Sequence, residues 1–177
     1  MKSLNKLCLS GIGVSLFVAL SMCLRVPVFE NYYLCLGYIV MAVWLKSVGI
    51  YSGTIVGTLG TVLYCILISG LRGMPGWAIG NIVIGLTLGV WFQFTKALKS
   101  VKSTFIVDIL TMIIIVFVSA FSILGVKSVV EVILYGQPFL VRATSNFNAF
   151  VADALVLIIA LPICNTVDKI VKRQELI

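Results

Sequence analysis

Residues 9–23 read LSGIGVSLFVALSMC, an apolar stretch in which a small side chain returns at every fourth position. These small residues, called the small-residue row below, are Gly11, Ser15, Ala19 and Cys23. A spacing of four places the side chains in one line along a helix. Inside a membrane, a line of small side chains lets a second helix approach closely. The stretch therefore predicts a membrane helix that packs against a partner through this row.

The composition extends the prediction to the whole chain. Of its 177 residues, 61% are hydrophobic and 11% are charged, and the mean hydropathy is +1.18. A soluble domain is about half apolar and about one quarter charged. Apolar stretches of roughly 17–25 residues, the length that crosses a bilayer, recur along the chain. We therefore expect an all-α integral membrane protein that forms one domain over residues 1–177.

Polar and turn residues divide the chain into six expected transmembrane helices. These cover residues 5–24, 32–46, 49–70, 75–95, 104–126 and 147–168. The second is short for a membrane span. The piece between the last two is the longest connection, and long loops in compact proteins often act as lids over a site. We therefore expect a lid over residues 127–146.

Glycines at GxxxG spacing occur in two of these helices. Gly53 and Gly57 lie in the third, and Gly85 and Gly89 lie in the fourth. Such pairs let helix backbones approach closely within a membrane bundle. We therefore expect these four glycines to pack inside the bundle.

The positions of lysine and arginine predict the orientation. With the N-terminus in the cytoplasm, nine basic residues fall on the cytoplasmic side: Lys2, Lys6, Lys46, Lys96, Lys99, Lys102, Lys169, Lys172 and Arg173. Four fall outside: Arg25, Arg72, Lys127 and Arg142. Because basic residues are enriched on the cytoplasmic side, we expect both termini there. Residues 1–23 are expected to be a retained helix rather than a cleaved signal, because Met22 is bulky where a cleavage site needs a small residue.

Several chemistries find no support in the sequence. It contains no GxxxxGK[ST] phosphate loop, no HExxH motif and no GxSxG motif. It has no histidine, the usual general base at neutral pH. Its five cysteines form no CxxC pair, so no metal site is expected. We therefore expect neither an enzyme nor a bound cofactor.

Polar residues gather near the start of the fourth expected helix, in GLRGMPGWAIGNIVIG (70–85). Arg72 precedes a turn, and Trp77 and Asn81 follow it four residues apart. Arginine offers a planar fork for a carboxylate, tryptophan a stacking surface, and asparagine both a donor and an acceptor. This set suits a small, flat, partly polar ligand. An equally open alternative is an interfacial tryptophan beside an arginine that reaches the membrane surface.

Asp153 is the strongest single candidate for a functional residue. It lies several residues inside the last expected helix. A charge there is unfavourable, and it usually faces a cavity or a partner. Asn146 lies seven residues earlier and so shares its helix face. We therefore expect Asp153 to face a polar site near the outer surface.

Six short spans, inward termini, no ATPase motif and the small-residue row together resemble the substrate-binding S component of energy-coupling factor (ECF) vitamin transporters. In that family an AxxxA-type motif in the first helix packs on a shared transmembrane T component. Gly11, Ser15 and Ala19 occupy the corresponding positions here. The resemblance implies that the chain captures a vitamin in an outward pocket and topples in the membrane while docked to the T component. It also implies two cytoplasmic ATPase subunits as partners.

The resemblance places the pocket at the outer ends of helices four to six and in the outer loops. Mapped onto this chain, the implied contacts are Arg72, Trp77, Asn81, Gln137, Arg142, Asn148 and Asp153. A thiamin-type signature is missing, whereas pantothenate, folate, vitamin B6 or its precursors and other flat nitrogenous compounds stay open. Arg72 favours an anionic ligand. The implied location is a bacterial plasma membrane.

A different class of function also fits the helices. A small membrane scaffold or assembly subunit without a ligand would explain the packing motifs equally well. It gives no reason for Asp153 or for the polar residues near Trp77. The two classes differ in whether a small molecule binds.

Overall fold

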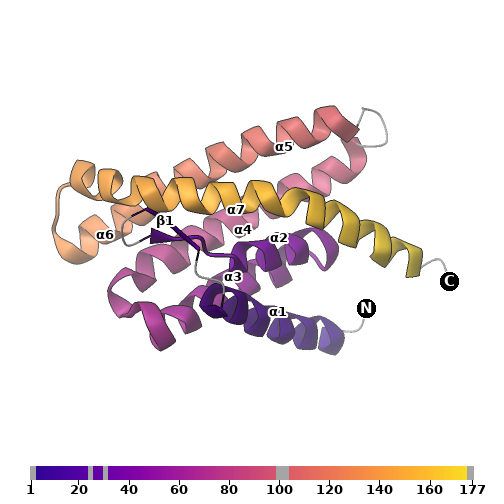
Figure 1. Ribbon diagram of the computed structural model, residues 1–177, viewed down its shortest axis with the longest axis horizontal. Helices are drawn as coiled ribbons and strands as arrows, with labels where there is room; N and C mark the ends of the chain where they lie inside the picture. The colour runs from indigo at the N-terminus through magenta and orange to yellow at the C-terminus, as the bar shows by residue number, and fades with distance from the viewer. Residues whose placement is uncertain (1–2, 24–25, 30–31, 99–103, 175–177) are drawn as a thin grey trace.

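A computed structural model describes residues 3–23, 26–29, 32–98 and 104–174 and shows an elongated helical bundle (Figure 1). Helix α1, Ser3–Cys23, is followed by a two-stranded antiparallel hairpin of β1, Pro27–Phe29, and β2, Tyr32–Tyr33. The remaining helices are α2, Gly37–Ser47; α3, Ile50–Tyr64; α4, Met74–Leu98; α5, Thr104–Ser119; α6, Ser128–Tyr135; and α7, Phe139–Gln174.

Three shorter helical segments join these elements. A segment of wide π geometry, Cys65–Ser69, extends α3, and a 3₁₀ turn, Leu71–Gly73, leads into α4. A second π segment, Ala120–Lys127, connects α5 to α6 without a break. As a result, one apolar helical run extends over Phe105–Tyr135.

Five helical runs are long and apolar enough to cross a membrane. They are Asn5–Cys23, Ile50–Ile68, Met74–Thr95, Phe105–Tyr135 and Phe139–Val171. The expected helix over residues 32–46 is wrong in its first part, because Tyr32–Tyr33 form a strand and α2 starts only at Gly37. With 11 residues, α2 is about 16 Å long, roughly half the thickness of a hydrocarbon core.

The expected lid loop over residues 127–146 is wrong. Residues 128–135 form α6, and α7 begins at Phe139, so that only residues 136–138 turn the chain. Gly136 ends α6 in the left-handed region at φ +65°, which glycine adopts without strain. The apolar residues of SVVEVILY repeat with helical spacing, and this pattern extends the helix that was expected to end at residue 126.

The glycines at GxxxG spacing pack inside the bundle, as predicted. A methyl group on Gly53 would overlap the backbone of Leu45 in α2, and one on Gly85 would lie 2.9 Å from the Cα of Thr54 in α3. Gly57 and Gly89 are equally close to neighbouring helices. The close contacts bring α2, α3 and α4 around a buried core that includes Phe17, Met41, Leu45, Ile84, Leu88, Val156 and Leu157.

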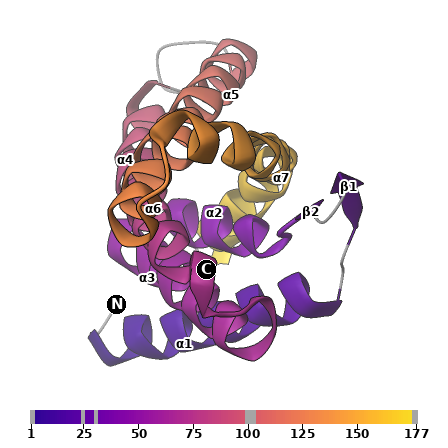
Figure 2. The same cartoon turned by 90° about the vertical axis from the view of Figure 1, so that its left-hand side faces the viewer.

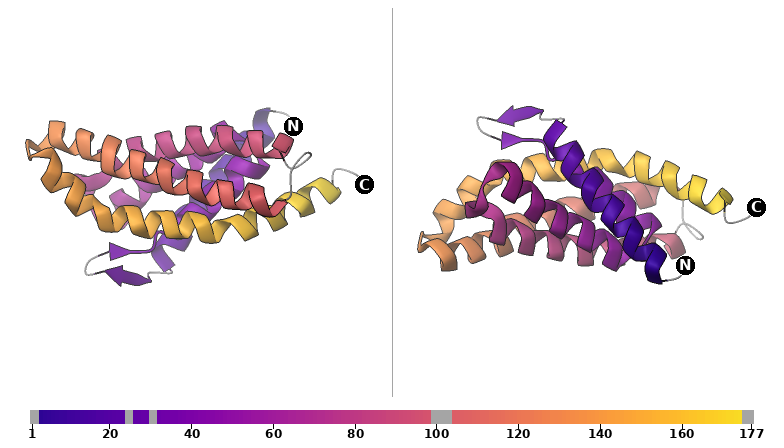
Figure 3. Two further views of the ribbon diagram at one scale, coloured as in Figure 1. Left: turned by 90° about the horizontal axis from the view of Figure 1, so that it is seen from above. Right: turned by 90° about the horizontal axis from the view of Figure 1, so that it is seen from below.

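The first residues of α1 and the last residues of α7 lie at the same end of the bundle, here called the terminal end (Figures 1 and 3). The α3–α4 and α6–α7 connections lie at the opposite end, here called the turn end. Figure 2 looks onto the turn end and shows the hairpin at the side of the bundle, near α7. The chain therefore runs along the long axis in alternating directions, with the hairpin and α2 together forming one of the passes.

A polar cavity near the turn end

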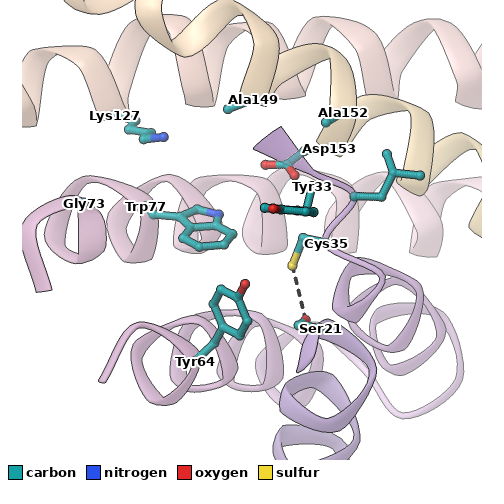
Figure 4. A pocket seen from close by; sticks show the side chains of 11 residues that line it. Ser21, Tyr33, Cys35, Tyr64, Gly73, Trp77, Lys127, Ala149, Ala152 and Asp153 are labelled. Atoms are coloured by element: carbon teal, nitrogen blue, oxygen red, sulfur yellow. Dashed lines mark hydrogen bonds between the residues drawn. The ribbon is translucent and has the colours of Figure 1, made fainter. Parts of the chain in front are cut away.

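A cavity of about 220 Å³ lies toward the turn end, between the hairpin and helices from both halves of the chain (Figure 4). Its aromatic wall consists of Tyr33 from β2, Tyr64 from the end of α3 and Trp77 from the first turns of α4. Its charged residues are Lys127 and Asp153. The cavity is thus assembled from segments that are far apart in the sequence.

Trp77 and Tyr64 form an aromatic corner of this cavity. Their ring centroids are 5.9 Å apart and their planes make an angle of 87°, the edge-to-face arrangement that aromatic pairs favour. Pro75 occupies the second position of α4, where its missing N–H leaves no helical bond unmade. Because α4 begins at Met74, Trp77 lies in its first turn, and there it lines the cavity.

A buried chain of hydrogen bonds supports the aromatic wall from below. The indole Nε1–H of Trp77 donates to the Tyr38 hydroxyl at 2.8 Å, and Tyr38 donates to Oδ1 of Asn81 at 2.6 Å. The amide of Asn81 donates to the Thr61 hydroxyl at 2.6 Å and to the Gly57 carbonyl at 3.2 Å. Tyr38, Asn81 and Thr61 are fully buried. The chain of bonds ties α2, α3 and α4 together and fixes the position of the indole ring.

Asp153 and Lys127 bring opposite charges to the cavity. Asp153 is only 5% exposed, and its carboxylate interacts with the Tyr38 hydroxyl and electrostatically with Lys127. Lys127 is the last residue of the second π segment. Its side chain packs against Gly76 of α4, where an added methyl group would lie 3.1 Å from the lysine Cγ. Figure 4 shows both charged side chains on the same side of the cavity as α7, opposite Tyr64.

A second polar cluster adjoins the cavity between α6 and α7. The amide of Asn146 donates to Glu131 at 3.0 Å and to the Ser128 hydroxyl at 3.1 Å. Arg142 approaches the same carboxylate at 3.9 Å, and its guanidinium lies over the ring of Tyr135. Glu131 is only 4% exposed, and two residues of α7, Asn146 and Arg142, interact with its carboxylate. The cluster anchors α6 on α7 beside Lys127.

The structure places the sequence-predicted ligand residues at different locations. Trp77 and Asp153 line the cavity together, and Asn81 lies beneath it. The other predicted contacts lie elsewhere: Arg142 beside Glu131, Gln137 in the α6–α7 turn, and Asn148 at a separate shallow hollow with Phe147. Arg72 belongs to the 3₁₀ turn before α4, and its side chain lies outside the part of the structure that is described.

Sequence reasoning missed several residues of the cavity. Lys127 was counted only as an outer loop charge, although Glu131 four residues later gave a signal for a helix with paired charges. Tyr33, Tyr64 and Tyr38 carry no local pattern that distinguishes them from other aromatic residues in apolar runs. Only the packing of the hairpin and α2 against α3, α4 and α7 brings them to the site.

The terminal end contains a further polar network. The Lys46 ammonium donates to Oδ1 of Asn165, and the amide of Asn165 lies 3.3 Å from the Asp108 carboxylate. Lys46 is 6% exposed, and its ammonium also lies 5.8 Å from the ring centre of Phe92. The network connects α2, α7 and α5 far from the cavity.

The small-residue row lies on the outer surface of α1. Gly11, Ser15, Ala19 and Cys23 are exposed, and nothing lies within 4 Å of a methyl group placed on Gly11. The opposite side of α1 packs into the bundle through Phe17, which is fully buried. The row is therefore available to a partner outside this chain.

In the part of the chain that the structure describes, five long apolar helical runs indicate a multi-pass helical membrane protein, and a small cavity with aromatic and charged walls lies within the bundle. Among the described residues, no group of three His, Cys, Asp or Glu side chains is placed to hold a metal ion. No protein-family model, curated protein or solved structure matches the chain.

Proposed function

We propose that the chain is the substrate-binding subunit of an ECF-type uptake system. It captures a vitamin or vitamin precursor from outside the cell. It delivers the ligand through a complex with a transmembrane T component and two cytoplasmic ATPase subunits.

The observation that carries this proposal is the cavity. Asp153 and Lys127, two charged residues of apolar helical runs, line one cavity that also has an aromatic corner. Ionisable residues inside membrane segments usually mark substrate or ion pathways. Small-molecule sites combine apolar and aromatic walls with a few placed polar groups. A ligand-free scaffold gives no reason to keep such a space open.

The exposed small-residue row supports the proposed partner. A helix that only contacts lipid needs no line of small side chains, whereas helix association in membranes uses such lines. Because the row points away from the bundle, it suits the T component rather than a helix of this chain.

The proposed arrangement in the membrane has six passes, with the hairpin and α2 forming the second. Both termini lie in the cytoplasm of a bacterial cell, and the cavity opens toward the outside. The excess of basic residues at the cytoplasmic positions supports this orientation.

The test of binding is to purify the chain and to identify co-purifying small molecules by mass spectrometry. We expect one compound to be recovered in near-stoichiometric amount. The Asp153→Asn variant is expected to lose it, because a hydrogen bond to a charged group contributes about 1.5–3 kcal/mol, or roughly ten- to hundredfold in affinity. Asp168→Asn is the matched control on α7, since Asp168 is not among the described residues that line the cavity. Recovery from none of the three proteins would favour the scaffold, and equal recovery from all three would place the binding site away from Asp153.

The test of docking is the double variant Ser15→Leu/Ala19→Leu. Both positions are exposed, so the added leucines meet lipid in the isolated chain at little energetic cost. We expect unchanged thermal stability and ligand recovery but no co-purification with the T component and no uptake. Ile12→Ala, also on the exposed side of α1 but outside the row, is the control. An intact complex with the double variant would refute docking through this row.

A further inference from the structure

Among the described residues, four charged side chains lie in or beside the cavity, two of each sign. Lys127 interacts electrostatically with two carboxylates, Glu131 and Asp153, and with the guanidinium of Arg142. Arg142 in turn approaches Glu131 at 3.9 Å. Two positive and two negative groups therefore balance each other within one polar region.

Among the residues that the structure describes, one charge of each sign lines the cavity itself. Asp153 and Lys127 belong to its wall, whereas Glu131 and Arg142 are paired with each other beside it. A bound molecule therefore meets one carboxylate and one ammonium. The carboxylate has acceptor sites beyond its contact with Tyr38, and an ammonium has three donors.

The balance disfavours ligands with a single charge. An anion that pairs with Lys127 would add a net negative charge to a buried region. A cation that pairs with Asp153 would do the opposite. Because buried charges are unfavourable unless paired, either ligand leaves one group poorly compensated. A molecule with both charges compensates both residues and leaves the region neutral.

The walls also restrict shape and size. The edge-to-face pair of Trp77 and Tyr64, with Tyr33 nearby, offers surfaces for one flat ring. The cavity of about 220 Å³ is smaller than the roughly 300–1,000 Å³ of sites for drug-sized ligands.

From these observations we infer that the cavity binds a small zwitterion with a single aromatic or heteroaromatic ring system, its anionic group toward Lys127 and its cationic group toward Asp153. The inference rests on the proposed binding function and adds the chemical class of the ligand. It differs from the preference for an anion that Arg72 suggested, because it is drawn from Lys127 and Asp153, the charged residues among those described on the wall.

The experiment compares ligands that share a ring and differ only in charge. The purified chain is titrated calorimetrically with L-phenylalanine, 2-phenylethylamine and 3-phenylpropionate, and with L-tryptophan, tryptamine and indole-3-propionate. In at least one set, the zwitterion is expected to bind at least tenfold more tightly than both analogues. A singly charged analogue that binds as tightly as its zwitterion would overturn the inference, as would no binding in either set.

Two variants assign each ligand charge to a residue. In Lys127→Met the zwitterion is expected to bind no better than the amine, because its carboxylate has lost its partner. In Asp153→Asn it is expected to bind no better than the acid. Both variants conserve approximate side-chain size, and thermal melts in detergent check that each protein is folded. A tenfold preference for the zwitterion that persists in both variants would also overturn the inference.

Failure of the inference is distinguishable from failure of the proposed function. If a compound co-purifies and is lost in Asp153→Asn, but carries one charge or none at neutral pH, the binding function stands and the zwitterion class is wrong. If no compound co-purifies and no member of either set binds, both are wrong.

Discussion

The side-chain amide of Asn81 joins three helices from a position with no exposure to solvent. It accepts from Tyr38 of α2 and donates to Thr61 and Gly57 of α3, while its own backbone belongs to α4. Tyr38 and Thr61 are buried too, so water cannot replace these bonds. At the scale of single residues, Asn81 therefore supports the cavity from beneath and is not among the described residues that line it.

Replacing Asn81 with alanine is expected to lower the free energy of unfolding. The change removes the Asn81 oxygen that accepts from Tyr38 and the amide that donates to Thr61, and each buried polar group left unsatisfied costs about 1–3 kcal/mol. Thermal unfolding in detergent, followed by circular dichroism, measures the effect. Thr87→Ala on the same helix is the control, because the exposed Thr87 hydroxyl bonds only to carbonyls of its own helix. An equal melting temperature for both variants would contradict this role.

Sequence reasoning at this scale identified Asp153 and Trp77, because a charge inside an apolar helix and an aromatic residue beside a turn stand out locally. It did not distinguish residues that line the cavity from residues that lie beneath it. Asn81 lies on the same face of α4 as Trp77, but below the cavity. It also missed Lys127, because the π segment that positions this residue has no sequence signature that we recognised. Wide π turns are frequent at functional sites, and their effect on side-chain direction appears only in three dimensions.

At the scale of elements, the glycines of α3 and α4 set how closely the helices approach. Gly53→Ala is expected to destabilise the isolated chain by about 1–3 kcal/mol, because the new methyl group would overlap the backbone of Leu45, which cannot rotate away. Gly11→Ala is the control in α1, where the new methyl group meets nothing within 4 Å. Melting temperatures of the two variants in the same detergent test this contrast. A loss of stability in Gly11→Ala equal to that in Gly53→Ala would show that the outer side of α1 also packs within the chain.

The short helix α2 is anchored at the terminal end by Lys46. Lys46→Met is expected to lower the free energy of unfolding by about 1–3 kcal/mol, because the side-chain oxygen of Asn165, which also contacts Asp108 through its amide, loses its donor. The melting temperature of Lys169→Met, an exposed position on α7, provides the comparison. Equal stability of the two variants would mean that α2 is held by its apolar contacts alone.

The element boundaries show which helices the hydropathy pattern predicts correctly and which it does not. Long apolar runs predicted α1, α3 and α4 closely, since each is one uninterrupted helix bounded by turn residues. The same reasoning placed a loop over residues 127–146, because polar side chains there suggested exposure to water. In the structure, Glu131, Arg142 and Asn146 satisfy each other between α6 and α7. Mutual pairing of polar groups across two helices is a tertiary property that a local pattern does not reveal.

At the scale of the whole molecule, both described chain ends lie at the terminal end, and the even number of passes that we propose would place them on one side of the membrane. Cysteines introduced one at a time into a cysteine-free background test the proposed orientation. In intact cells, a membrane-impermeant maleimide is expected to label Gln137→Cys in the α6–α7 turn but not Lys169→Cys near the end of α7. Permeabilised cells should label both. The reverse pattern in intact cells would invert the orientation, and with it the side from which the cavity receives its ligand.

The apolar run of α7 has a consequence for the lipid around the protein. Its 33 residues extend for about 50 Å, whereas a typical hydrocarbon core is about 30 Å thick. Matching these lengths by tilt alone would require roughly 50°, beyond the range of about 0–40° observed for membrane helices. The run therefore bends at Pro162, extends past the acyl chains or draws the lipid outward. Longer acyl chains cover more of the turn end and lengthen the path from water to the cavity, so membrane thickness is expected to control how quickly a ligand enters.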